Sequence, residues 1–92
     1  MRNSKEIIKA EEELFDKIWI NRHIVLRYGI LTGQEIAAPH IWAKALKESQ
    51  RIIEKYGLDN LIPKDDFEWG MWNGKFSTLR WINGDEWDNF EI

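Results

Sequence analysis

The chain has no cysteine, only two histidines and no long apolar run. Without cysteine it forms no disulfide, offers no thiolate nucleophile and builds no cysteine-based metal site. No apolar run approaches the ~18 residues that a membrane span requires, so no membrane association is expected. The N-terminal stretch MRNSKEIIKAEEE lacks the apolar segment of a signal peptide, which predicts a cytoplasmic protein.

An excess of positive charge is also missing. Lysine and arginine number 13 against 16 acidic residues, for a formal net charge of −3. Proteins that grip a nucleic-acid backbone carry basic surfaces, so a nucleic-acid partner is not expected. Tryptophan, by contrast, is abundant, with six in 92 residues. A chain of this length predicts a single domain over residues 1–92.

Three segments show helical periodicity. The first starts near Asn3 or Ser4, since Asn3 and Glu6 have capping-box spacing, and it ends at Gly29 or Gly33. Its predicted buried stripe comprises Ile7, Leu14, Phe15, Ile18, Trp19, Val25 and Leu26. The second runs from Pro39, a favourable first helical residue, to the residue before Gly57.

The third segment starts at Asp65 or Asp66 and ends at Asn83-Gly84. Asp65 and Glu68 again have capping-box spacing. Apolar residues cover most of its circumference, which predicts the most buried helix of the three. The sequence therefore predicts an all-α fold, a compact three-helix bundle, with the acidic and aromatic tail 85–92 packed on it. Strands are the competing interpretation, because Ile24-Val25-Leu26 and the segment 76–81 include good strand formers. However, no two segments of alternating pattern are joined by a hairpin turn.

Two glycines interrupt the third helix. Each glycine costs about 1 kcal/mol relative to alanine, so something should offset the cost of Gly70 and Gly74. The favoured interpretation is close approach of another helix backbone. The alternative is a slot for a flat ligand beside Trp81.

Charged residues fall on helix faces that should be apolar. They are Glu11, Arg22, Glu68 and Lys75. Buried charges are costly unless paired, so one hypothesis is an internal ion network. The other is a partly buried pocket for a nucleotide-like anion, with Trp72 or Trp19 as its aromatic wall. The ligand-binding candidates of that second hypothesis are Arg22, Glu68, Trp72 and Lys75.

The C-terminal end supplies the other candidate site. Arg80 can pair with the acidic tail and fix its return, or the tail itself can recognise a partner. Aromatic anchors inside a charged rim are typical of protein interfaces. The partner-binding candidates are Arg80, Asp85, Glu86, Trp87, Asp88 and Phe90.

Signs of catalysis and of cofactors are weak. His23 and His40 lie on different predicted helices, and neither has the Glu-x-x-His spacing of helical metal sites. No nucleophile elbow and no phosphate-cradling glycine loop is present. We therefore expect no catalytic residue, no metal and no cofactor, and the protein is predicted not to be an enzyme.

The block Asp66-Phe67-Glu68-Trp69-Gly70-Met71-Trp72-Asn73-Gly74-Lys75-Phe76-Ser77-Thr78-Leu79-Arg80-Trp81, followed by Gly84-Asp85-Glu86-Trp87-Asp88, is distinctive. It resembles the C-terminal signature of a family of small uncharacterised proteins from bacteria and their phages. The close resemblance covers about a quarter of the chain, and the ending Asn89-Phe90-Glu91-Ile92 departs from the pattern. No activity is established for that family, so the resemblance implies no functional residue. It does imply that the third helix and the tail act as one unit.

Two functions follow as hypotheses. The first is a small non-enzymatic binding protein that engages a protein partner or a second copy of itself. In a protein encoded by a phage or a mobile element, this function would be inhibition of host machinery. The second is a binder, or sponge, for a small anionic ligand.

Overall fold

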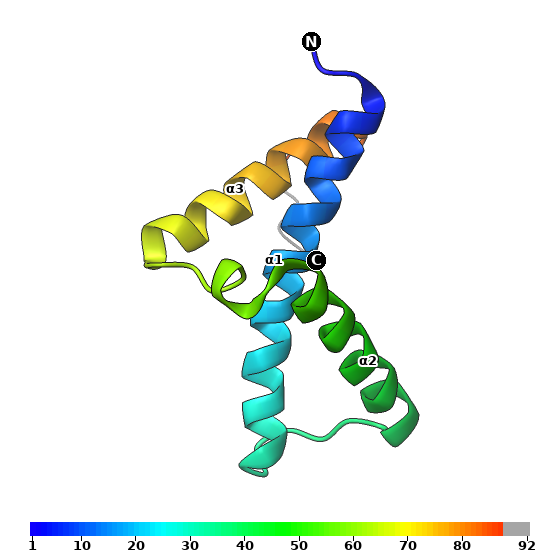
Figure 1. Cartoon of the computed structure of the whole chain (residues 1–92), viewed down its shortest axis with the longest axis vertical. Helices are drawn as coiled ribbons and strands as arrows, with labels where there is room; N and C mark the ends of the chain where they lie inside the picture. Colours follow the sequence, from blue (N-terminus) through cyan, green and yellow to red (C-terminus); the bar gives the residue numbers. More distant parts are fainter. Residues whose placement is uncertain (88–92) are drawn as a thin grey trace. The chain divides into compact units, whose positions relative to one another are not determined.

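The computed structural model describes residues 1–87, and all regular structure in that range is helical. Its elements are α1 (Ser4–Leu31), α2 (Pro39–Tyr56), the short 3₁₀ helix η1 (Leu58–Asn60) and α3 (Asp66–Ile82) (Figure 1). The all-α class is confirmed, as are the three main helices. In the described range, no helix is both long and apolar enough to cross a membrane.

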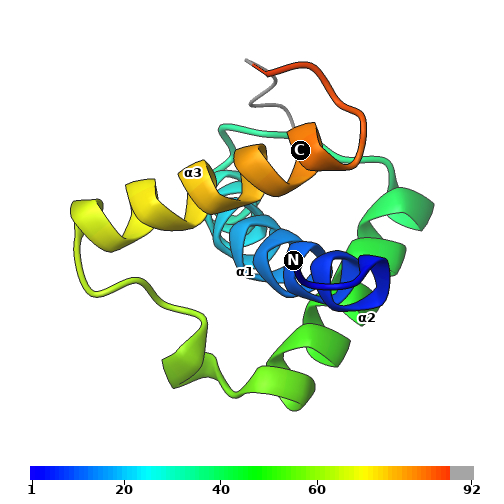
Figure 2. The ribbon, with the colours of Figure 1, turned by 90° about the horizontal axis from the view of Figure 1, so that it is seen from above.

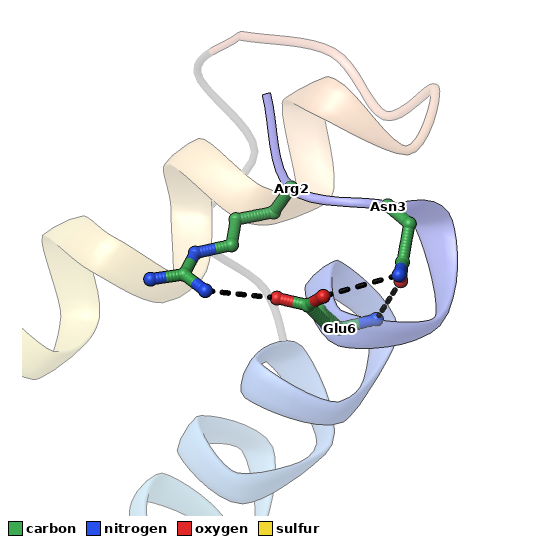
Figure 3. A network of polar contacts seen from close by, with 3 residues as sticks. All are labelled: Arg2, Asn3 and Glu6. Atoms are coloured by element: carbon green, nitrogen blue, oxygen red, sulfur yellow. Dashed lines mark hydrogen bonds and ion pairs between the residues drawn. The ribbon is translucent and has the colours of Figure 1, made fainter.

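The predicted helix ends are confirmed by their hydrogen bonds. At the start of α1 the Glu6 amide donates to Asn3 Oδ1 over 2.9 Å, and the Glu6 carboxylate accepts from Asn3 Nδ2 and from Arg2 (Figure 3). At the start of α3 the Glu68 amide donates to Asp65 Oδ1 over 2.8 Å. These side chains satisfy amide groups that have no partner within the helix.

Glycine ends two of the helices. Gly57 follows α2 with φ +80°, and its amide donates to the carbonyl of Ile53. Gly33 follows the end of α1 with φ +77°. A side chain is strained in this left-handed region, so glycine there stops a helix and turns the chain.

The chain divides into two units. Unit 1 comprises Met1–Ile18 and Pro63–Ile92, and unit 2 comprises Trp19–Ile62. The boundary lies within α1, so each unit contains one half of that helix. The single compact bundle over residues 1–92 stays a prediction.

In unit 1, α3 crosses the N-terminal half of α1 (Figures 1 and 2). Its core joins Ile18 of α1 to Trp72 and Phe76 of α3, and Leu14 and Trp69 pack against them. A 2.8 Å hydrogen bond from Asn83 Nδ2 to Glu11 Oε2 ties the end of α3 to α1.

In unit 2, the C-terminal half of α1 packs against α2 and against Leu61, the residue that follows η1. The core consists of Ile20, Ile52 and Leu61, which are almost completely buried. Asn21 donates a 2.7 Å hydrogen bond to the carbonyl of Leu61. This bond holds the segment after η1 against α1.

Two expectations about buried faces are wrong. Val25 and Leu26 of α1 are 72% and 39% exposed, because Ile20 and His23 occupy the buried positions in this half of the helix. The third helix is also not buried all round. Its apolar residues Phe67, Met71, Trp81 and Ile82 are all exposed, because only the side that carries Trp72 and Phe76 contacts α1.

The expectation for the α3 glycines is wrong as well. A Cβ atom added at Gly70 or at Gly74 would meet nothing within 4 Å. No other backbone therefore approaches either residue within the described chain. Both glycines lie on the exposed side of α3.

Candidate functional site

The C-terminal end of α3 carries a pair of exposed tryptophans. Trp81 lies in the last turn of the helix and Trp87 follows the turn at Gly84. Their ring centroids lie 4.9 Å apart with the rings edge to face at 81°. Both side chains stay about half exposed, at 50% and 58%. The two rings therefore support each other and still present apolar surface to solvent.

An ion pair fixes the start of the tail. Arg80 Nε donates to Asp85 Oδ2 over 2.5 Å, and the Asp85 amide donates to the Arg80 carbonyl over 2.9 Å. The Arg80 guanidinium also lies 5.3 Å from the centre of the Phe76 ring. The predicted pairing of Arg80 with the acidic tail is confirmed at Asp85. Glu86 is exposed, and Asp88 and Phe90 lie outside the described residues.

A groove runs on one flank of the α1–α3 contact in unit 1. This acidic groove has a volume of about 310 Å³ and is lined by Glu11, Glu12, Phe15, Asp16, Phe76 and Arg80. Phe15 and Phe76 form its aromatic part, with ring centroids 6.0 Å apart. Asp16 is buried, at 7% exposure. The prediction from sequence missed this groove because its acidic and aromatic residues come from two helices at opposite ends of the chain.

A second groove of unit 1 has a volume of about 570 Å³. This lysine groove is lined by Ala10, Glu13, Leu14, Lys17, Trp72, Lys75, Thr78 and Leu79. Lys17 Nζ lies 5.2 Å from the centre of a Trp72 ring and 3.5 Å from Glu13 Oε1. Two lysines and one tryptophan, Trp72, thus line the same groove.

Three of the four residues predicted to bind an anion lie in unit 1, and the fourth, Arg22, lies in unit 2. Trp72 and Lys75 line the lysine groove, whereas Arg22 is an exposed residue of unit 2. Glu68 instead accepts a 3.1 Å hydrogen bond from the amide of Lys64, before α3. Glu11 accepts from Asn83. Within the described residues of unit 1, no ion pair joins any two of Glu11, Glu68 and Lys75, so this part of the predicted internal ion network is wrong. The part that includes Arg22 of unit 2 stays a prediction.

A histidine between two tryptophans is the main feature that the sequence did not reveal. His23 is 4% exposed, and its ring stacks on Trp19 at 5.0 Å and on Trp42 at 5.1 Å. Its Nε2 atom is buried and has no hydrogen-bond partner in the described chain. Burial, together with the nearby charge of Arg27, lowers the pKa of His23 below its ordinary value. The i, i+4 spacing of Trp19 and His23 could have revealed half of the stack.

Residues 1–87 contain no group of three or more histidine, cysteine or acidic side chains placed to hold a metal ion. The resemblance noted for the C-terminal block stays a prediction. No family model, no curated protein and no solved structure matches this chain.

Proposed function

We propose that this chain is a small non-enzymatic binding protein that engages a protein partner through the C-terminal end of unit 1. The observation that carries the proposal is the exposed pair Trp81 and Trp87, held edge to face beside the Arg80–Asp85 ion pair. Tryptophan is the residue type most enriched among the anchors of protein interfaces, and an anchor held in place before binding loses little entropy. More specifically, the protein would be an inhibitor of host machinery that is encoded by a phage or a mobile element.

The charge around the anchors favours a partner with a basic surface. Asp85 and Glu86 flank the tryptophans, and Glu11, Glu12 and Asp16 line the acidic groove of the same unit. Arg80 is a basic residue of the same region, and it forms an ion pair with Asp85. Opposite charges across an interface raise the association rate and exclude partners of the wrong sign.

The test is capture from a lysate of a related host, with three baits compared. Wild-type bait should retain a defined protein that Trp87→Ala bait loses. The matched control is Tyr28→Ala, which removes an aromatic side chain of similar exposure, 66%, from unit 2. All three baits must show the same helical circular dichroism. The proposal is wrong when Trp87→Ala bait retains the same proteins as the wild type.

A second candidate function is supported by the lysine groove. Lys17, Lys75 and Trp72 line one groove, and a nucleotide-like anion would place its phosphate at the ammonium groups and its base against the indole. Saturable quenching of tryptophan fluorescence by ATP would support it. Lys75→Ala should weaken that quenching, whereas Lys44→Ala, an exposed lysine of α2, should not. Wild-type protein without saturable quenching at millimolar ATP contradicts this function.

A further inference from the structure

The outer side of α3 is apolar and uncovered in the described chain. Four of its side chains have exposed fractions between 39% and 78%, namely Phe67, Met71, Trp81 and Ile82. The opposite side of the same helix carries the buried residues Trp72 and Phe76. One helix thus has two apolar sides, of which one packs against α1. This outer face goes beyond the partner site at the tail, with which it shares only Trp81.

The residues of this face have a symmetric order. Phe67, Gly74 and Trp81 are seven residues apart, so they follow one line along the helix with a drift of only about 20° per step. Gly74 lies midway between the two aromatics, about 10 Å from each along the axis. Gly70 precedes it by four residues and Thr78 follows it by four. The order of residue types along the face is therefore the same in both directions: an aromatic residue, a small residue, the central Gly74, a small residue and an aromatic residue.

Charge is absent along that line. The exposed residues Phe67, Gly70, Gly74, Thr78 and Trp81 carry none, although the chain as a whole has a net charge of −3. In a two-fold pair, a charge near the axis faces the same charge of the other copy, and the two repel. An uncharged face is therefore one that two copies of a net acidic chain can bring together without repulsion.

The shape of the face allows close pairing. Apart from the adjoining residues of α3 itself, no atom of residues 1–87 lies within 4 Å of a Cβ built at Gly70 or Gly74, so a partner helix can reach the α3 backbone at the centre of the face. Phe67 and Trp81 rise on either side of this low region. Helices approach most closely where small residues face one another. The cost of two exposed glycines within α3 then has a physical reason that the isolated chain does not supply.

We infer that α3 pairs with α3 of a second copy, antiparallel and with its two-fold axis at Gly74. In this register Phe67 of one copy lies against Trp81 of the other, and Gly70 lies against Thr78. Complete burial of all four exposed apolar side chains would remove at most about 450 Å² per copy from solvent, or roughly 900 Å² for the pair. Stable interfaces bury about 1,200 Å² or more, so the dimer is weak and its population depends on concentration.

The first test measures mass by sedimentation or light scattering of purified chain from about 10 μM to 1 mM. The wild type should shift from monomer to dimer across this range. Gly74→Lys places two like charges at the axis and should raise the dissociation constant at least tenfold. Its control, Ala43→Lys, makes the same charge change on the exposed surface of α2 and should behave as the wild type. Lysine favours a helix more than glycine does, so the Gly74→Lys chain should keep its fold.

A mixing experiment tests the antiparallel register. Phe67→Lys and Trp81→Glu should each be monomeric alone, because each loses both of its cross-helix aromatic contacts. An equimolar mixture should dimerise, because the lysine introduced in one chain then meets the glutamate introduced in the other, and the second pair stays aromatic. A parallel pairing brings position 67 against position 67 and gives no such rescue. A mixture that stays monomeric, while the wild type dimerises, therefore overturns this register.

Two outcomes overturn the pairing of two copies through α3. One is a wild type that remains monomeric up to about 1 mM, and the other is a Gly74→Lys chain that dimerises as well as the wild type. Neither outcome decides the function proposed for the tail, because lysate capture is compared at Trp87. Gly74→Lys leaves Trp87 and the Arg80–Asp85 pair unchanged, so the two surfaces are separable by experiment.

Discussion

Phe67 and Phe76 lie on opposite sides of α3. Nine residues separate them, which is about two and a half helical turns, so their side chains point about 180° apart. Phe76 is 7% exposed in the core of unit 1, whereas Phe67 is 78% exposed. The same side chain on one helix therefore has a structural role at one position and is available for binding at the other.

This contrast predicts a large difference between two matched substitutions. Phe76→Ala should lower the free energy of unfolding by about 3–5 kcal/mol, because it leaves a cavity beside Trp72 and Ile18. Phe67→Ala should change it by no more than about 0.5 kcal/mol. Urea denaturation at a protein concentration below that of self-association measures both. Equal losses at the two positions would mean that Phe67 is buried in solution.

Replacing Gly70 or Gly74 by alanine should stabilise the protein. Both have open space around their Cα atoms and lie in regular helix, so alanine should fit without strain. Each substitution should raise the free energy of unfolding of dilute monomer by about 1 kcal/mol. Gly57→Ala is the opposite control, since its φ of +80° disfavours any side chain. A loss of stability in Gly70→Ala would show that another backbone packs there.

The first turn of α3 depends on its cap. Asp65→Ala removes the acceptor of the 2.8 Å hydrogen bond from the Glu68 amide and should cost about 1 kcal/mol of unfolding free energy. Asp65→Asn keeps an acceptor oxygen and should restore most of that loss. Thermal denaturation followed by circular dichroism distinguishes the two. An Asp65→Ala chain as stable as the wild type would contradict the role of this cap.

His23 makes stability depend on pH. Its pKa is lowered in the folded chain, so the unfolded chain takes up the proton first as the solution is acidified. The free energy of unfolding is therefore not reduced by His23 above its ordinary pKa of about 6.5, and it falls as the pH drops below that value. Urea titrations at about pH 7.5 and about pH 5.5, on either side of that value, should show this loss.

The matched variants are His23→Phe and His40→Gln. Phenylalanine can occupy the space between Trp19 and Trp42 and carries no titrating group, so the loss on acidification should shrink. His40 is exposed at the start of α2, and its substitution should leave the loss unchanged. A His23→Phe chain with the pH dependence of the wild type would assign the effect to another group.

The sequence alone determined the helices and their ends. The signals at the helix ends act on backbone groups only a few residues away, so local spacing is sufficient to predict where each helix begins or ends. These signals are the Asn3–Glu6 and Asp65–Glu68 pairs, Pro39 and Gly57. The pairing of Arg80 with the acidic tail was predictable for the same reason, because Asp85 follows only five residues later.

Only the tertiary structure decided which side of each helix is buried. Periodicity placed Val25 in a buried stripe and Gly70 beside another helix, and both are exposed. The stack of His23 between Trp19 and Trp42 joins α1 to α2, and the acidic and lysine grooves join α1 to α3. The physical reason is that a helix with apolar residues around most of its circumference has several sides able to bury area. Which side does so depends on the shape of the neighbour, and that information lies elsewhere in the chain.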